Sequence, residues 1–246
     1  MSSTASTNPT GTITTLSVLM PAHNEARTLR EIVRRVLNAP VTQAIELVIV
    51  NDGSTDGSRE LIDELAAEDE RIVAIHHDRS RGKGTAIRTA IAAMTGQVAI
   101  LQDADLEYDP NGYAVLLDPI LQGEADAVYG SRFLKSPRRQ VHGFWHSQGN
   151  RLLTLLCNMV SDLALSDMET CYKAVRADLL KALPLTSTRF EFEVEITIRL
   201  ARADARIYEV PISYHGRTRA EGKKIGAKDG VHALWALLKY GLLDRR

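Results

Sequence analysis

Short apolar runs that alternate with segments of helical period are the feature that most limits how this chain can fold. The runs are rich in aliphatic residues and too short for typical helices, as in strands buried on both faces of a sheet. Because right-handed crossovers place helices on both sides of such a sheet, the sequence predicts an α/β fold, an open sandwich around a mainly parallel sheet in a single domain. We expect strands at Leu16–Met20, Ile45–Val50, Ile72–His76, Val98–Gln102 and Asp126–Ser131.

The composition agrees with one soluble domain, since 44% of the 246 residues are hydrophobic and 25% are charged. The two cysteines, Cys157 and Cys171, provide no disulfide framework and no cysteine-based structural metal site, which favours a reducing compartment. Residues 1–15 are rich in Ser and Thr and are expected to be a disordered leader. We expect residues 16–228 to form the domain and 229–246 to form a C-terminal amphipathic helix that belongs to it.

Charge is distributed unevenly along the chain. The net charge of −1 excludes a generally basic nucleic-acid binder, so no nucleic acid is expected as a partner. Residues 206–246 nevertheless hold nine Lys and Arg against four Asp and Glu, an excess of five positive charges. This tail is expected to bind a pyrophosphate, a lipid phosphate or an anionic membrane surface, unless it is simply a solvated helix face.

Polar residues follow the first two predicted strands, at the edge of the sheet where α/β proteins bind ligands. Asn24 and Thr55 could cap helices, and Asp56 could favour a first helical turn. Capping does not explain Asp52, which directly follows an apolar strand, where its carboxylate can accept hydrogen bonds from a ribose or a base. We therefore favour nucleotide binding.

A basic loop with two glycines, Gly82-Lys83-Gly84, follows the third predicted strand and leads into a helix expected from about Thr85 to Met94. The glycines let backbone amides approach phosphate oxygens, and the helix N-terminus adds partial positive charge. The loop is neither a P-loop nor the dinucleotide fingerprint. It predicts an anion site of otherwise unspecified type.

Three alternating carboxylates, Asp103, Asp105 and Glu107, follow the fourth predicted strand. If the strand direction persists, the three side chains share one face and can converge on a hard divalent cation. The alternative is an exposed loop in which solvent relieves their repulsion. The apolar strand that precedes them favours a site for Mg²⁺ or Mn²⁺.

Several motifs together resemble the family-2 glycosyltransferases with the GT-A fold, particularly the dolichyl-phosphate mannosyltransferase-like branch. The similarity spans most of the chain, and Asp103-Ala104-Asp105 has the form of the family's DxD motif. The other motifs are Pro21–Glu25, Val50–Asp56, Gly82–Gly84, Gly130–Arg132 and Asp167–Lys173.

The resemblance implies a donor site for a nucleotide sugar at the first four strands. Asp103 and Asp105 would meet the pyrophosphate through the metal, with Asp105 counted as catalytic. Glu107 would be a third metal ligand, although family members often carry Gln there. The residues implied to bind the nucleotide sugar are Pro21, Ala22, Asn24, Glu25, Asp52, Lys83, Asp103 and Ala104.

The resemblance also implies an acceptor side. Arg132 ends the fifth predicted strand and would meet an acceptor or donor phosphate, although a surface salt bridge is the simpler alternative. Ser147, in a helix expected over Gly143–Asp162, would bind an acceptor phosphate. Apolar residues of that helix could line a lipid groove, but we expect them to be an ordinary buried face. They are Leu152, Leu155, Leu156 and Met159.

Asp167 corresponds to a family position linked to chemistry, and its role depends on the acceptor. A sugar hydroxyl needs a base to remove its proton, and Asp167 would be that base. A phosphomonoester is already largely dianionic near neutral pH, so it can attack without losing a proton. In that case Asp167 would only position other groups.

The tail resembles a mobile basic loop that closes over the donor pyrophosphate. The usual Arg-to-Lys spacing can be met by Arg217 with Lys223, or nearly by Arg219 with Lys224. Beyond this loop a helical stripe lies near basic residues, which suits a membrane-surface helix and equally suits packing on the domain or a dimer partner. The stripe comprises Val231, Leu234, Trp235, Leu238 and Leu242.

The resulting hypothesis is an inverting, metal-dependent hexosyltransferase. It transfers a hexose from a nucleotide sugar, GDP-mannose first and UDP-glucose next, to a polyprenyl phosphate such as dolichyl or undecaprenyl phosphate. We expect it in the cytoplasm, peripheral to the membrane. The alternatives are transfer to a hydroxyl of a glycan or small molecule, with Asp167 as base, and a noncatalytic nucleotide-sugar-binding module.

Overall fold

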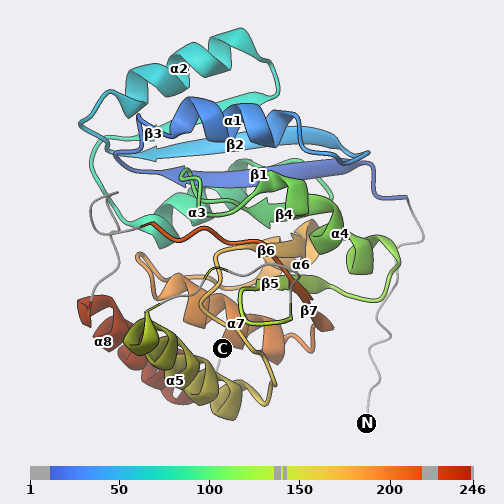
Figure 1. The fold of residues 1–246 in the computed structure, drawn as a ribbon, viewed down its shortest axis with the longest axis vertical. Coiled ribbons are helices and arrows are strands. Elements are labelled where there is room, and N and C mark those ends of the chain that lie inside the picture. Colours follow the sequence, from blue (N-terminus) through green and yellow to red (C-terminus); the bar gives the residue numbers. More distant parts are fainter. Residues whose placement is uncertain (1–11, 136–139, 141–142, 218–226, 245–246) are drawn as a thin grey trace.

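One seven-stranded sheet organises the computed structural model, which describes residues 12–135, 140, 143–217 and 227–244. The strand order is β3-β2-β1-β4-β6-β5-β7, and β6 is antiparallel to both of its neighbours while the other pairs are parallel. The predicted α/β sandwich with a mainly parallel sheet is confirmed (Figure 1). The strands are β1 Thr15–Ala22, β2 Ala44–Asp52, β3 Ile72–His77, β4 Val98–Leu101, β5 Ala127–Ser131, β6 Lys173–Arg176 and β7 Ile207–Pro211.

All five predicted strands are present, and no end differs from the prediction by more than two residues. The sequence analysis did not anticipate β6 and β7. Strand β6 is short and begins and ends with basic residues, while β7 is an edge strand whose Tyr208 is largely exposed. Neither strand has the continuous apolar run that marks a strand buried on both faces.

Helices connect the strands and cover the sheet. Helix α3 packs on β1 and β2, and α7 lies against β5, where Thr197 and Tyr129 share a hydrogen bond of 3.0 Å. The α-helices are α1 Leu29–Leu37, α2 Ser58–Glu68, α3 Lys83–Ala93, α4 Tyr113–Leu121, α5 Phe144–Ser161, α6 Ala177–Ala182, α7 Phe192–Arg202 and α8 Ala227–Ala236. A 3₁₀ turn, η1, spans Pro110–Gly112, and a π-helix, η3, spans Leu237–Leu243.

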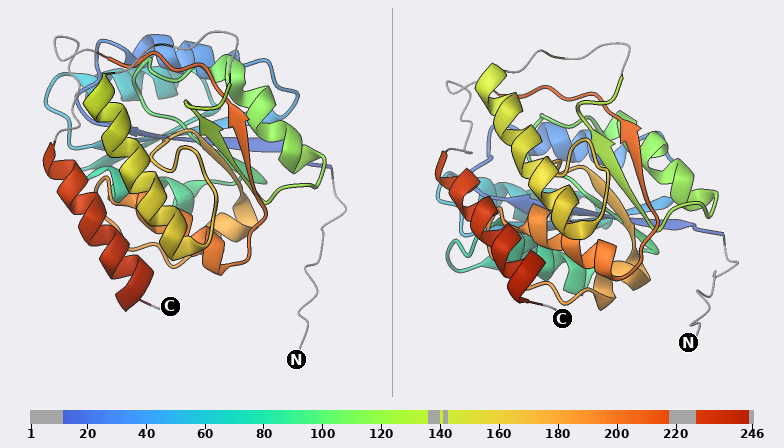
Figure 2. Two further views of the ribbon diagram at one scale, coloured as in Figure 1. Left: turned by 60° about the horizontal axis from the view of Figure 1, so that its bottom comes forward. Right: turned by 90° about the horizontal axis from the view of Figure 1, so that it is seen from below.

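Helix α5 lies beside α8 and η3, and these three elements together form one end of the molecule (Figure 2). Helical structure thus covers Ala227–Leu243, which begins two residues before the expected C-terminal helix at 229–246, and it continues directly from α8 into η3. Most of the expected leader, residues 1–11, lies outside the described residues. No helix in the described ranges is long and apolar enough to cross a bilayer.

The outer face of α5 is apolar and exposed, which contradicts the expected buried face. Leu152, Leu155 and Met159 are 54%, 56% and 73% exposed. The buried face of α5 instead carries small and polar residues. Asn150 and Thr154 lie on this face and form hydrogen bonds with the segment that precedes β6. Of the four predicted residues, Leu156 alone is half-buried against the core.

The stripe of the C-terminal helices is likewise exposed. Leu234, Trp235, Leu238 and Leu242 all face outward, while alanines, Leu237 and Tyr240 pack inward. The side chain of Val231 lies outside the described residues. These four side chains are between 42% and 58% exposed, so a large part of each one is left uncovered by the described residues.

Candidate active site

A cavity of about 390 Å³ opens at the carboxyl ends of β1, β2 and β4. Parallel strands bring these ends to one edge, so segments far apart in the sequence meet there. Eleven of the predicted site residues line the cavity: Pro21, Ala22, Glu25, Asp52, Lys83, Asp103, Ala104, Asp105, Glu107, Arg132 and Arg217. The lining does not include Asn24, Ser147 or Asp167, and Lys223 and Lys224 lie outside the described residues.

Asp52 holds the glycine-bearing loop in place. Its carboxylate accepts hydrogen bonds from His77 Nδ1, from the Ser80 hydroxyl, and from the backbone N–H groups of Arg81 and Gly82, all at 2.8 to 2.9 Å. Burial raises the pKa of Asp52, but these hydrogen bonds outweigh it and hold the pKa below its ordinary value. The carboxylate is thus an ionised anchor that fixes this loop at the cavity.

The loop before α7 closes the cavity from a side that the sequence analysis missed. Arg189 and Phe190 line the cavity beside Gly82 and Lys83. A Cβ on Gly82 would collide with the carbonyl of Thr188. A Cβ on Gly84 would likewise lie 2.7 Å from the carbonyl of Ser187, so both glycines are required for this close packing, and the paired glycines were the signal in the sequence. The other lining residues not predicted as binding residues are His23, Ser80, Arg81, Gly82, Ala86 and Tyr214.

The acidic cluster follows a strand that ends sooner than predicted. Strand β4 stops at Leu101, so the carboxylates do not alternate along a strand. They lie in a loop, where Lys83 Nζ is 2.9 Å from Asp103 Oδ1. Within the described ranges, no three His, Cys, Asp or Glu side chains already form a metal-binding group. The two basic side chains Lys83 and Arg217 compensate the carboxylates instead.

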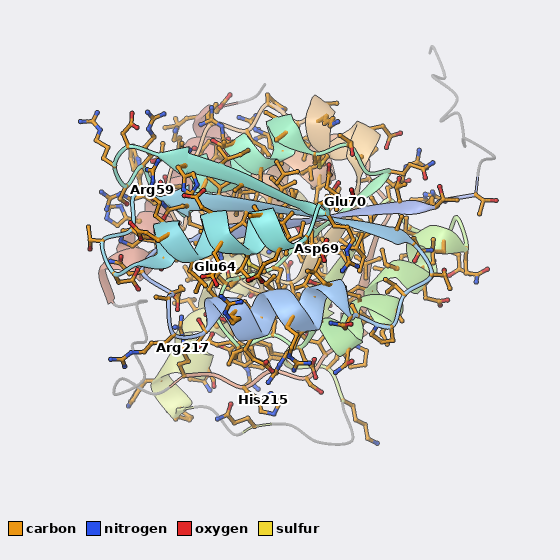
Figure 3. The ribbon with its side chains drawn as sticks, turned by 90° about the horizontal axis from the view of Figure 1, so that it is seen from above. Arg59, Glu64, Asp69, Glu70, His215 and Arg217 are labelled. Atoms are coloured by element: carbon orange, nitrogen blue, oxygen red, sulfur yellow. The ribbon has the colours of Figure 1, made fainter. Side chains whose placement is uncertain are left out.

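Arg217 is the main partner of the cluster. Its guanidinium lies 2.6 Å from Asp105 Oδ2 and 3.0 Å from Glu25 Oε2, and its backbone N–H donates to Glu107 at 2.7 Å. The segment that carries Arg217 and His215 lies on the side of α1 away from α2 (Figure 3). Glu107 also accepts a hydrogen bond from the Tyr214 hydroxyl at 2.7 Å. Residues distant in sequence thus converge on the predicted cation ligands.

The charges of the cavity suit a cation and an anion together. Its described lining holds five acidic residues and five basic ones. Burial, with the negative charges of Asp103 and Glu107, raises the pKa of Asp105 to about 7. Oxygen ligands from carboxylates are those that Mg²⁺ and Mn²⁺ prefer, so the residues fit a divalent cation. Lys83 and Arg217 would then be available to a diphosphate.

Asp167 lies behind Arg132 rather than in the cavity. The guanidinium of Arg132 donates two hydrogen bonds of 2.7 Å to its carboxylate, and Asn150 donates a third at 3.0 Å. Burial of Asp167 is complete, yet the charge of Arg132 keeps its pKa below the ordinary value. Arg132, predicted either to bind phosphate or to form a surface salt bridge, therefore forms a buried bidentate ion pair at the cavity wall.

Two other predicted residues make local contacts. Asn24 holds the turn after β2, since its side chain accepts a hydrogen bond from the backbone N–H of Thr55 at 2.8 Å. It does not cap α1, whose N-cap residue is Thr28. Ser147 lies in the first turn of α5, where its hydroxyl donates to the carbonyl of Gly143 at 3.1 Å.

Glu169 gives a prediction for the pH dependence of stability. Its Oε1 is buried without a hydrogen bond from the described residues. Burial, and then the charge of Glu193, raises its pKa to about 7 from 4.5. Between these values the folded protein keeps a proton that the unfolded chain has released. The stability that this group contributes is therefore fully present below pH 4.5, and about 3 kcal/mol of it is lost as the pH rises from 4.5 to 7.

Glu169→Gln removes this titration, so the variant should gain stability relative to the wild type as the pH rises from 5 to 8. Urea denaturation at both pH values measures the difference in free energy of unfolding. Because both proteins retain Asp105, its titration cancels. A difference that is the same at both pH values would contradict the assignment.

Solved structures of other proteins share this fold. A glucosyl-3-phosphoglycerate synthase from Mycobacterium tuberculosis, solved with Mn²⁺, UDP and its product, shares the fold at a TM-score of 0.69 and 20% identity. The match covers 93% of this chain and 80% of that one. The same enzyme was also solved with Mg²⁺ and UDP.

Relatives with known names include lipid-phosphate enzymes. The chain is 29% identical to an undecaprenyl-phosphate mannosyltransferase of Micrococcus luteus, with 92% of this chain and 94% of the relative covered. It is 27% identical to a dolichol-phosphate mannosyltransferase of Pyrococcus furiosus over 94% of this chain and 66% of the relative. It is 31% identical to the glycosyltransferase AglD of Haloferax volcanii, but it spans only 33% of that protein.

The family model for glycosyl transferase family 2 matches residues 17–183, which contain most of β1, all of β2 to β6 and most of the cavity lining. The motifs after β1, β2 and β4 lie within the matched range. The predicted relationship is therefore confirmed, and the chain belongs to glycosyl transferase family 2.

Proposed function

We propose that this enzyme transfers a hexose, with inversion at the anomeric carbon, from a nucleotide sugar to a polyprenyl phosphate. The exposed apolar face of α5 is the observation that carries the lipid acceptor, because Asn150 of this helix donates a hydrogen bond to Asp167, the partner of the cavity residue Arg132. The relatives named as dolichol-phosphate and undecaprenyl-phosphate mannosyltransferases support the same acceptor class. GDP-mannose is the first donor to test, and UDP-glucose is the second.

The donor would lie along the edge formed by β1, β2 and β4. The loop anchored by Asp52 presents backbone amides and Lys83 to the diphosphate. Asp103, Asp105 and Glu107 would hold Mg²⁺ or Mn²⁺, which supplies positive charge to the departing nucleoside diphosphate. Pro21, Ala22 and Glu25 line the same wall and are proposed to contact the nucleoside with Asn24.

The acceptor phosphate would lie near Arg132. The guanidinium of Arg132 lies 5.1 Å from the centre of the Tyr214 ring and is held in place by its ion pair with Asp167. A phosphate dianion attacks the anomeric carbon without losing a proton, so no base is required. We propose that Asp167 acts through Arg132, and that Ser147, Lys223 and Lys224 bind further phosphate oxygens.

The hydroxyl-acceptor alternative requires Asp167 to accept a proton. Its buried carboxylate already accepts hydrogen bonds from Arg132 and Asn150, and its pKa is lowered, which makes it a weak base. The noncatalytic alternative does not explain why so many compensating charges line one cavity. The first observation favours transfer to a phosphate, and the second favours a catalytic site.

Membrane contact is proposed through α5, α8 and η3, on the cytoplasmic face. Helix α5 contains Arg151 and no acidic residue, whereas α8 and η3 together contain Lys228 and Lys239 with one acidic residue, Asp229. Trp145 is 83% exposed near the start of α5. An apolar surface on elements that carry more basic than acidic residues suits an anionic lipid surface.

The double variant Leu155→Glu/Met159→Glu tests the lipid acceptor and its surface. Because both residues are exposed, the fold should persist, while binding to vesicles that contain anionic lipid should weaken at least about tenfold. Transfer to polyprenyl phosphate in those vesicles should fall in parallel. Transfer to a short polyprenyl phosphate in detergent should stay within about twofold of the wild type.

Val115→Glu is the matched control, because it adds a charge at an exposed apolar position on α4. It should bind vesicles and transfer sugar as the wild type does. Unchanged vesicle binding in the α5 variant would refute this membrane surface. Wild-type protein that transfers sugar to no polyprenyl phosphate in either format would refute the acceptor class.

A further inference from the structure

Glu193, near the start of α7, contacts both a lysine that lines the cavity and a lysine that is buried in the protein core. Its side chain is buried between two lysines that come from different elements. Glu193 Oε2 pairs with Lys173 at the start of β6, and Lys83 Nζ at the start of α3 lies 3.5 Å from Glu193 Oε1. Lys83 lines the cavity, whereas Glu193 and Lys173 do not. Glu193 can therefore influence a ligand only through Lys83.

The two carboxylate oxygens of Glu193 differ in their hydrogen bonding. Oε2 is engaged by Lys173, which is completely buried and also donates to the carbonyls of Met168 and Thr170. Oε1 is buried and accepts no hydrogen bond from the described residues. An unsatisfied buried carboxylate oxygen is unfavourable, so this oxygen can accept a hydrogen bond from Lys83.

Lys83 forms an ion pair with Asp103 in the structure, with 2.9 Å between Lys83 Nζ and Asp103 Oδ1. Asp103 is also a proposed ligand of the divalent cation, and a carboxylate that binds a cation attracts an ammonium group less. Lys83 then needs a second anionic partner to remain beside the diphosphate. Glu193 Oε1 is in place for this role, a short side-chain movement away.

Backbone packing between the segment before α7 and the loop that carries Lys83 fixes the positions of Glu193 and Lys83 relative to each other. The residues before α7 pack on the glycines that flank Lys83, where a Cβ on Gly84 would lie 2.7 Å from the carbonyl of Ser187. Glu195, two residues after Glu193, accepts hydrogen bonds from the backbone N–H groups of Thr186 and Ser187. The α7 N-terminus and the Lys83 loop therefore form one packed unit.

We propose that Glu193 is a positioning residue, which takes over Lys83 from Asp103 when the donor diphosphate and its cation bind. The proposal rests on the proposed function, since it assumes a diphosphate beside Lys83. Lys83 contacts the donor before and during transfer, so loss of Glu193 should weaken donor binding more than it slows turnover. Glu193 itself contacts neither substrate.

The test is a double-mutant cycle between Glu193→Gln and Lys83→Gln, with calorimetric binding of GDP or UDP in the presence of Mn²⁺. Glu193→Gln keeps the shape of the side chain and an oxygen for Lys173. It should raise the dissociation constant about tenfold, raise the donor KM similarly, and leave kcat within about twofold. In the Lys83→Gln background, Glu193→Gln should have almost no further effect.

Two further variants separate this role from stability. Lys173→Met/Glu193→Gln removes the buried lysine with its partner, so it should fold while showing the same tenfold weakening even if Glu193→Gln alone folds poorly. Glu46→Gln removes a half-buried carboxylate from the first half of β2 and should bind nucleotide normally.

Binding by the Glu193 variants within twofold of the wild type would overturn the proposal, and so would losses that add in the cycle. Wild-type protein that binds neither nucleotide would instead refute the proposed donor site. The two failures are therefore distinguishable.

Discussion

Asp105→Asn is expected to lower kcat/KM for sugar transfer about a thousandfold. Asp105 is buried between Asp103 and Glu107, and its carboxylate faces Arg217 at 2.6 Å. An amide removes the charge that a divalent cation requires while keeping the size of the side chain. Both cation binding and charge stabilisation of the departing diphosphate should therefore be lost.

Transfer kinetics with a saturating acceptor, together with titration of Mn²⁺ in the presence of GDP or UDP, measure this loss. Asp109→Asn is a matched control four residues away, because asparagine can still accept the hydrogen bond from the backbone N–H of Asn111. This control should transfer sugar at the wild-type rate. Asp105→Asn protein with more than a tenth of wild-type activity would show that the acidic cluster does not carry the chemistry.

Asp167→Asn is expected to lower the free energy of unfolding by about 3 to 5 kcal/mol. The substitution leaves the guanidinium of Arg132 buried without its anionic partner. An asparagine can replace only one of the two hydrogen bonds that Asp167 accepts from this guanidinium, since its amide nitrogen is a donor. Urea denaturation at pH 7 measures the effect, and a loss below 1 kcal/mol would contradict the buried ion pair.

The same variant separates the two acceptor classes when it is assayed well below its melting temperature. If Asp167 positions Arg132, turnover should fall about tenfold and donor binding should be retained. If Asp167 is a base for a hydroxyl, turnover should be almost abolished while donor binding persists. The second outcome would contradict the phosphate acceptor.

Local patterns predicted much of the fold and of the donor side. Strands β1 to β5 follow from apolar runs, and the residues at their carboxyl ends lie at the cavity because parallel strands end at one edge. Asp52, Lys83 and Asp103 were identified in this way. The family resemblance then supplied the proposed role of each residue.

The remaining features depend on contacts between distant segments. Arg217 pairs with Glu25 and Asp105, and no spacing in the sequence reports such a contact. The period of α5 predicted an amphipathic helix but not which face is buried. Its inner face includes Asn150, whose partner Asp167 belongs to another segment, and this leaves the leucines outside.

Arg132, predicted to form a surface salt bridge or to bind phosphate, likewise depends on a contact with a distant segment that the sequence does not reveal. An arginine at the end of a strand has many available partners, and only the fold brings Asp167 behind it. Lys173 similarly gave no sign that it starts a strand or that it is completely buried with Glu193. Buried ion pairs between separate elements are therefore visible in the structure and not in the sequence pattern.

The most direct test of the account is sugar transfer by purified protein with Mg²⁺ or Mn²⁺, a short polyprenyl phosphate and a panel of radiolabelled GDP- and UDP-sugars. We expect metal-dependent appearance of label in an organic-extractable lipid with one donor, GDP-mannose before UDP-glucose. Donor hydrolysis with no labelled lipid, for every donor and both metals, would contradict the proposed transfer to a polyprenyl phosphate.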